Sequence, residues 1–281
     1  MSSITITDGL FGCGEVLAKR LSDLQGCRYL GEEALIKAVQ RYRLPEVMPT
    51  NMFELEPPWW KRLLENHRVY RIALQAAMCD IAEGGNFVYH GAVGQELVPE
   101  IRQIIKIFLI VPIEYRIEQL RLAKGMSGES AQRWLAEMDK VNDRRIKAIF
   151  GVGWRDPTRY DIVLNMAKFG VETAARLIVK MTQQVECQAT GQSERMFQDF
   201  LLEAKVRAAL LASTKTCSMD VKVQVNSRLV HVSGFLFPLE FDFKDEIIHV
   251  IEGVPGVNKV TADIRLLPMD DSVPIIPENS L

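Results

Sequence analysis

Short apolar runs alternate with stretches of helical periodicity along the first two-thirds of the chain. The short runs are rich in β-branched and aromatic residues, and we expect strands at residues 4–8, 86–90, 104–111 and 161–165. Apolar residues recur at helical spacing between them, which predicts helices from 14 onward and at 32–42, 59–82, 112–123, 127–150 and 169–185. This alternation is typical of an α/β fold with a parallel sheet covered by helices on both faces.

The pattern changes near residue 190, after a small polar stretch at 188–193. The elements expected beyond it are helices at 196–211 and 245–251 and strands at 220–225, 229–234 and 260–266. Their order, α-β-β-α-β, predicts a second, small α/β domain. We therefore expect domains at 1–190 and 195–268, with an extended or disordered proline-rich tail at 269–281.

Composition and charge narrow the function classes. The formal net charge of −2 lacks the basic signature of a nucleic-acid binder, so we expect no nucleic-acid partner. The five cysteines are scattered and have no metal-ligand spacing, which favours a reducing cytoplasm. The longest apolar run, at 104–112, is too short to span a bilayer, and the N-terminus lacks the features of a signal peptide. These features predict a cytoplasmic protein that is not transmembrane.

A glycine-rich turn, GLFGCG, joins the first expected strand to the first expected helix at residues 9–14. Amide groups at such a helix start bind phosphate, and glycines let the backbone approach the anion closely. The full pattern is G-x-x-x-x-G-K-[ST], but Glu15 stands at the lysine position and no Ser or Thr follows it. Two interpretations remain open: a degenerate phosphate loop, or a plain strand-to-helix turn that binds nothing.

Further blocks extend the similarity beyond the turn. In order, they are ITI at 4–6, DG at 8–9, GCG at 12–14, LAKRL at 17–21, CRYL at 27–30, AEGGNFVYHGA at 82–92, VPIEYRI at 111–117, WRDP at 154–157 and YDIVLN at 160–165. Together they resemble the cytidylate-kinase-like family over roughly residues 3–185. The resemblance implies a P-loop fold and the Mg²⁺-dependent transfer of a phosphoryl group from ATP to a nucleoside monophosphate or a similar small substrate.

The same resemblance implies a set of site residues. Those expected to contact the phosphates of ATP are Gly9, Gly12, Cys13, Gly14 and Glu15. Those expected to be catalytic are Arg116, at a helix start, and the lid residues Arg144, Arg145 and Lys147, because phosphoryl transfer needs positioned cations. Those expected to bind the substrate are Glu32, Lys37 and His90.

Several of these residues also have plainer interpretations. The lid cations could form a solvated helix face that pairs with Asp139 and Asp143. His90 could be a structural histidine, and Cys13 could fill space rather than react. Trp59 and Trp60 could stack a base, but such a pair more often begins a helix and packs on the core.

The chain departs from the family pattern at several positions. Glu15 removes the loop lysine, the pair Tyr89–His90 replaces a glycine–arginine pair, and Gly31 stands where an acid is expected. These changes favour an alternative function, in which a catalytically inactive pseudokinase serves as a nucleotide sensor or scaffold.

The C-terminal part resembles a BON domain. The similarity rests on residues 200–210, the strand at 221–225, the segment VHVSG at 230–234 and VPGV at 254–257 before the last strand. It implies binding to a protein or to phospholipid, and it leaves a homo-oligomer possible.

Overall fold

The computed structural model describes residues 2–42, 67–236 and 244–266. The chain divides into two compact units, Met1–Ala208 and Ala209–Leu281. The first part of the predicted helix at 59–82, with the Trp59–Trp60 pair, and the predicted tail at 269–281 lie outside the described residues. Within the described part, no helix is both long enough and apolar enough to cross a membrane.

The first unit contains a five-stranded parallel sheet with strand order β2-β3-β1-β4-β5. Its strands are β1 (Ser3–Thr7), β2 (Arg28–Gly31), β3 (Phe87–His90), β4 (Ile104–Ile110) and β5 (Ile162–Asn165). The four strands predicted in this region are confirmed. β2 was not predicted, because the edge segment RYLG is too short and too exposed to show an alternating pattern.

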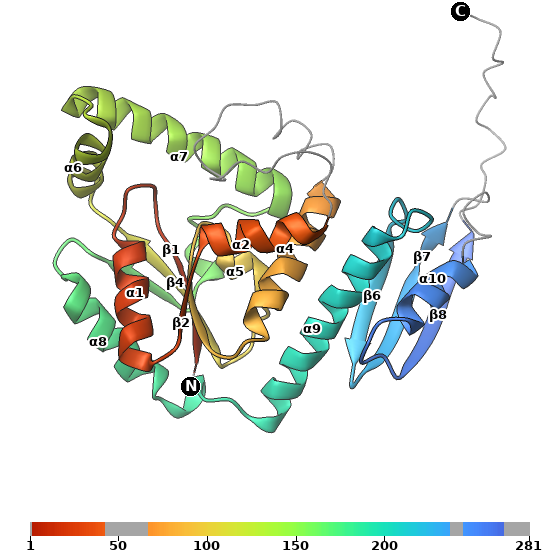
Figure 1. The fold of residues 1–281 in the computed structure, drawn as a ribbon. Coiled ribbons are helices and arrows are strands. Elements are labelled where there is room, and N and C mark those ends of the chain that lie inside the picture. The colour runs from red at the N-terminus through yellow and green to blue at the C-terminus, as the bar shows by residue number, and fades with distance from the viewer. Residues whose placement is uncertain (1, 43–66, 237–243, 267–281) are drawn as a thin grey trace, which may run out of the picture. The chain divides into compact units, whose positions relative to one another are not determined.

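Helices cover both faces of the sheet, as Figure 1 shows and as the sequence predicts. One face packs against α1 (Gly14–Gln25) and α8 (Val171–Thr182). The other face packs against α2 (Glu32–Val39), α4 (His67–Ala82) and the short α5 (Gly94–Leu97). Single 3-10 turns lie at Gln40–Tyr42, Pro157–Arg159 and Val185–Cys187.

Two further helices, α6 (Ile113–Lys124) and α7 (Gly128–Phe150), follow β4. Ser127 caps the start of α7, since its hydroxyl accepts a hydrogen bond from the Ser130 amide at 3.3 Å. The two helices enclose a small apolar cluster, on which side chains of the glycine-rich turn pack. Figure 1 shows α6 and α7 above the carboxyl ends of the strands, where open α/β sheets bind ligands. We refer to α6 and α7 as the lid helices.

The helix α9 (Gly191–Ala212) begins after the polar stretch near residue 190. Leu201 and Ala204 of this helix pack against Cys79 of α4, and Lys205 forms an ion pair with Glu83. The first part of α9 therefore belongs to the first unit. The domain limits predicted from the sequence place the boundary at 190–195, at the start of this helix.

The second unit contains a three-stranded mixed sheet, which matches the predicted α-β-β-α-β order. Antiparallel β6 (Val221–Asn226) and β7 (Leu229–Leu236) are joined by Ser227 and Arg228, which both have positive φ values, of 51° and 64°. Positive φ values at both residues are typical of the tight two-residue hairpin turn, because the twist of such a turn matches the twist of the flanking strands. α10 (Lys244–Glu252) lies between β7 and its parallel neighbour β8 (Lys259–Leu266).

We expect the apolar layer under α1 and α8 to contribute strongly to the stability of the first unit. Ile107 of β4 is fully buried there, so Ile107→Ala should lower the free energy of unfolding by about 2–5 kcal/mol. The matched control is Leu122→Ala, because Leu122 is 72% exposed and its loss should change stability by less than about 0.5 kcal/mol. Equal effects of the two substitutions in denaturant unfolding would contradict the assigned core.

Candidate functional site

The glycine-rich turn forms a tight loop between the end of β1 and the start of α1. The Gly12 amide donates a hydrogen bond to the Gly9 carbonyl at 3.0 Å. A Cβ atom on Gly12 would collide with the Asp8 carboxylate, and one on Gly14 would lie 2.6 Å from His90 Nε2. Asp8 and His90 therefore pack directly on the loop, and glycine is needed because no side chain fits at these positions.

The carboxylate of Asp8 lies inside the loop and is 5% exposed. One of its oxygens accepts a hydrogen bond from the Gly14 amide at 2.7 Å, and the other lies 2.8 Å from His90 Nε2. The first amides of a helix carry partial positive charge and are the groups that bind phosphate. One amide of the candidate phosphate site is thus already bound to an anion of the protein itself.

His90 ends β3 and lines a cavity beside this carboxylate. Burial opposes the charge of the imidazole, but the hydrogen bond and the charge of Asp8, helped by Glu32 and Glu15, raise the pKa of His90 above its ordinary value. The geometry and the surrounding charges therefore favour an imidazolium paired with Asp8.

Arg116 connects the loop to the lid helices. Its Nε donates to the Leu10 carbonyl at 2.8 Å, and its two terminal nitrogens donate to the Asp139 carboxylate at 2.9 and 2.7 Å. Arg155 donates to the same carboxylate at 2.5 Å and lies over the ring of Trp154 at 4.7 Å. The Arg116 side chain is 8% exposed, so this bidentate pair is shielded from water and holds the loop against α6 and α7.

The two large side chains of the loop point away from the phosphate position. Phe11 has a φ of 58° and packs edge-on against Trp134 of α7, with ring centroids 5.9 Å apart. Leu10 joins the same apolar cluster. Glu15 bonds to Lys19 at 2.6 Å, and both side chains are 56% exposed. Neither Phe11 nor Glu15 therefore binds the Gly14 amide.

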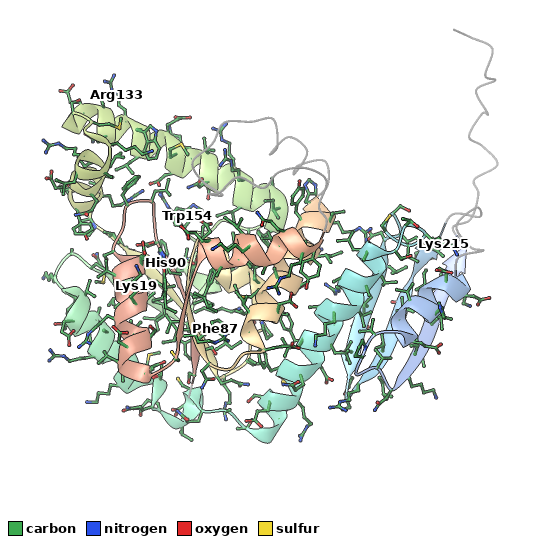
Figure 2. The ribbon with its side chains drawn as sticks, viewed as in Figure 1. Lys19, Phe87, His90, Arg133, Trp154 and Lys215 are labelled. Atoms are coloured by element: carbon green, nitrogen blue, oxygen red, sulfur yellow. The ribbon has the colours of Figure 1, made fainter. Side chains whose placement is uncertain are left out.

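A cavity of about 860 Å³ extends from the loop to the lid. Its walls come from the loop, α2, the end of β3, both lid helices and the segment after α7. In Figure 2, His90 lies beside the start of α1, and Trp154 lies between the sheet and α7. The volume is in the range of small-molecule sites.

Three buried polar atoms belong to side chains that line this cavity. They are Glu32 Oε1, Asn142 Oδ1 and Trp154 Nε1, and none has a hydrogen-bond partner among the described residues. Burial raises the pKa of Glu32 to about 7, so this carboxyl is partly protonated near neutral pH. Unsatisfied polar atoms are costly in a native protein, and a bound ligand could satisfy these three.

The structure brings many of the predicted site residues to this cavity. Those that line it are Gly9, Gly12, Glu15, Glu32, Lys37 and His90. Gly14 contributes its amide to Asp8, while Cys13 is buried, and burial raises the pKa of its thiol to about 11. The Cys13 side chain therefore fills space and is a poor thiolate.

The predicted lid cations do not line the cavity. Arg144, Arg145 and Lys147 lie on α7, but this helix presents Asn142 and Ile146 to the cavity instead. Arg144 is largely exposed, and one of its terminal nitrogens lies 3.7 Å from a carboxylate oxygen of Glu137. This position agrees with the alternative interpretation of the sequence, in which these cations lie on a solvated helix face. Among the predicted catalytic cations, Arg116 contacts the loop through its hydrogen bond to the Leu10 carbonyl.

Sequence reasoning did not assign Asp8, Asn142 or Trp154 to the site. One signal was available for Asp8, because it follows β1 at the carboxyl edge of the sheet, where ligands bind in such folds. Asn142 and Trp154 had no comparable signal, since their position depends on how the lid packs.

The described residues contain no group of three His, Cys, Asp or Glu side chains that could hold a metal ion. Val16 also stands where the motif has a hydroxyl residue that would bind Mg²⁺. The residues present therefore do not fit a protein-held Mg²⁺ at the loop.

Comparisons with known proteins identify the family of the chain. The model of the Cytidylate kinase-like family matches residues 3–168, more than half of the chain, and the chain belongs to that family. A cytidylate kinase of Pyrobaculum arsenaticum is 29% identical over 110 residues, which are 39% of this chain and 59% of that relative. A cytidylate kinase of Methanopyrus kandleri is 24% identical over 178 residues, 59% of this chain and 86% of that relative.

The chain thus spans only 59% of the Pyrobaculum arsenaticum enzyme, and less of some other cytidylate kinases that it matches. Among solved structures, an uncharacterized protein from Eubacterium ventriosum matches with a TM-score of 0.50 and 19% identity. That match covers 64% of this chain and 98% of the other, and it shows the shared fold alone.

We expect Arg116 to be a main determinant of the loop's position. Arg116→Ala should lower the free energy of unfolding by about 3 kcal/mol, because it leaves the buried Asp139 carboxylate without its bidentate partner. Arg121→Ala is the control, since the Arg121–Glu118 pair on the same helix is half exposed and should contribute less than about 1 kcal/mol. A small loss for Arg116→Ala in denaturant unfolding would show that the loop is held by other contacts.

Proposed function

We propose that this protein is a nucleotide-binding phosphotransferase that acts in the cytoplasm and transfers a phosphoryl group from ATP to a nucleoside monophosphate or a similar small substrate. The observation that carries the proposal is the cavity itself. It joins a glycine loop at a helix start to a wall with three buried polar atoms that have no hydrogen-bond partner within the described part of the chain, Glu32 Oε1, Asn142 Oδ1 and Trp154 Nε1. The family membership supports the same conclusion.

The residues around the cavity would have different roles in the reaction. Amides at the start of α1 would bind the transferred phosphate once the Asp8 carboxylate has left Gly14. Arg116 would keep the loop in register with the lid, and Asn142 would orient the acceptor. Mg²⁺ would neutralise phosphate charge while held by the nucleotide. Such a site works by positioning and by charge stabilisation, which phosphoryl transfer requires.

A nucleotide panel tests the proposal directly. The full chain is expected to show a thermal shift with ATP and Mg²⁺, and turnover with at least one of the nucleoside monophosphates or small hydroxyl compounds tested. Absence of both the shift and the turnover would overturn the proposal.

The proposed role of Asn142 in orienting the acceptor gives a more specific prediction. Asn142→Leu removes a side-chain carbonyl oxygen that has no partner among the residues the structure describes, so it should raise the KM for the acceptor on the order of tenfold and leave the affinity for ATP unchanged. Asn258→Leu is the matched control, because Asn258 is exposed in the second unit. An unchanged acceptor KM in Asn142→Leu would place the acceptor elsewhere.

An alternative function is favoured by the loop. Glu15 occupies the lysine position, and Asp8 already holds the Gly14 amide, so the domain could be a pseudokinase that senses nucleotide or serves as a scaffold. This alternative predicts nucleotide binding without turnover, or no binding at all. Glu15→Lys should then produce no activity, whereas a gain of turnover in that variant would contradict it.

For the second unit we propose a BON-like module that binds a protein or phospholipid. The proposal is supported by its mixed sheet, in which α10 connects the parallel strands β7 and β8. Co-sedimentation of the full chain with phosphatidylglycerol vesicles tests the lipid partner, and the mass of the full chain in solution tests a homo-oligomer. A monomer that stays in the supernatant would contradict both of these partners.

A further inference from the structure

We infer that His90 supplies the positive charge that the phosphate loop lacks at its lysine position, so that the loop binds phosphate strongly only while His90 is protonated. The inference rests on the proposed nucleotide binding and adds its charge donor and its dependence on pH. It follows from the positions of the charged groups around the loop.

The basic side chains on α1 and α6 near the loop form ion pairs with carboxylates of the chain. Glu15 replaces the lysine of the motif, and it pairs with Lys19 on the exposed side of α1 at 2.6 Å. Arg116 directs both terminal nitrogens to Asp139. The Lys19 and Arg116 side chains are thus each paired with a carboxylate of the chain, and the charge of Arg116 is committed to a largely buried pair.

His90 is in the right place to take this role. A Cβ atom on Gly14 would lie 2.6 Å from His90 Nε2, so the imidazole contacts the last glycine of the loop. The same ring is hydrogen-bonded to Asp8, whose other oxygen holds the Gly14 amide. The imidazole and the amide that a phosphate would use are therefore linked through one carboxylate.

The charge of this pair decides whether a phosphate is repelled. When His90 is protonated, its charge cancels that of Asp8, and the pair is neutral. When His90 is neutral, a net negative charge remains against the Gly14 amide, which a phosphate must also reach. The interaction is strong because both side chains are largely buried, where charges are poorly screened.

The other groups around the cavity determine how His90 titrates. The titratable and charged side chains that line it, besides Asp8 and His90, are Glu15, Lys19, Tyr29, Glu32, Glu33, Lys37 and Tyr115. Burial disfavours the imidazolium, but Asp8, Glu32 and Glu15 all favour it, and together they raise the pKa of His90. Phosphate affinity should therefore be high below this pKa and should fall as the pH rises through it.

The test measures the affinity of the full chain for ATP and for inorganic tripolyphosphate between pH 5.5 and 8.5. The wild-type protein should lose affinity on the order of tenfold across this range. His90→Arg carries a permanent charge, so it should bind tightly with a flatter profile, while His90→Gln should bind weakly at every pH. Titration of the ligand itself is common to all variants and cancels in the comparison. His249→Gln, an exposed position on α10, is the control and should match the wild type.

A second measurement keeps the inference falsifiable if a variant folds poorly. Linkage requires that tripolyphosphate raise the pKa of His90 in the wild-type protein, which the imidazole resonances report directly by NMR. An unchanged pKa on saturation, or equal pH profiles for the wild type and His90→Arg, would overturn the inference. If ATP binding depends on His90 and on pH as described but no turnover is found, the inference about His90 is supported and the proposed phosphotransfer is wrong. If turnover is found and does not depend on the residue at position 90, the inference about His90 is wrong and the proposed phosphotransfer is supported.

Discussion

The hydrogen bond between the Asp8 carboxylate and the Gly14 amide is the interaction on which the function of the loop depends. The amides at the start of α1 are the groups that give a glycine loop its affinity for phosphate. Here one of them is bound by a carboxylate of the same chain at 2.7 Å, and that carboxylate is in turn bound by His90. An incoming phosphate must compete with Asp8, and the protonation of His90 determines how strongly Asp8 opposes it.

The position of the lid depends on a second buried pair. Arg116 binds the Leu10 carbonyl of the loop and the Asp139 carboxylate of α7, so it connects the loop to both lid helices. Phe11 strengthens this connection by packing on Trp134, and the contact explains why a bulky residue with a positive φ is tolerated in a loop of glycines. Because the charge of Arg116 is paired with Asp139, it is not directed into the cavity, and few cations of the described part of the chain line the cavity.

Much of the fold could be predicted from the sequence, because hydrophobic periodicity depends on local spacing alone. The strands β1, β3, β4 and β5 and the long helices follow from it. The edge strand β2 does not, since its four residues include only two with large apolar or aromatic side chains. Sequence alone also could not place the first part of α9, because the contacts of Leu201 and Ala204 with α4 are tertiary.

The candidate site was predictable in part for a similar reason. Gly9 and Gly12 follow the end of β1 and His90 is the last residue of β3, so their convergence at the carboxyl edge follows from the topology. Which face of α7 meets the cavity depends on how the lid packs, and the packing selects Asn142 over the neighbouring Arg144. The role of Asp8 was hidden for another reason, since only the tight packing of the loop places its carboxylate on Gly14.

The most direct test of the central claim is the amide resonance of Gly14 in the ¹⁵N-labelled full chain during titration with ATP and Mg²⁺. The account predicts a large, saturable shift of this resonance, together with a shift of the His90 imidazole, as phosphate displaces the Asp8 carboxylate. Saturation with ATP that leaves the Gly14 amide unchanged, or no binding of ATP at all, would contradict it.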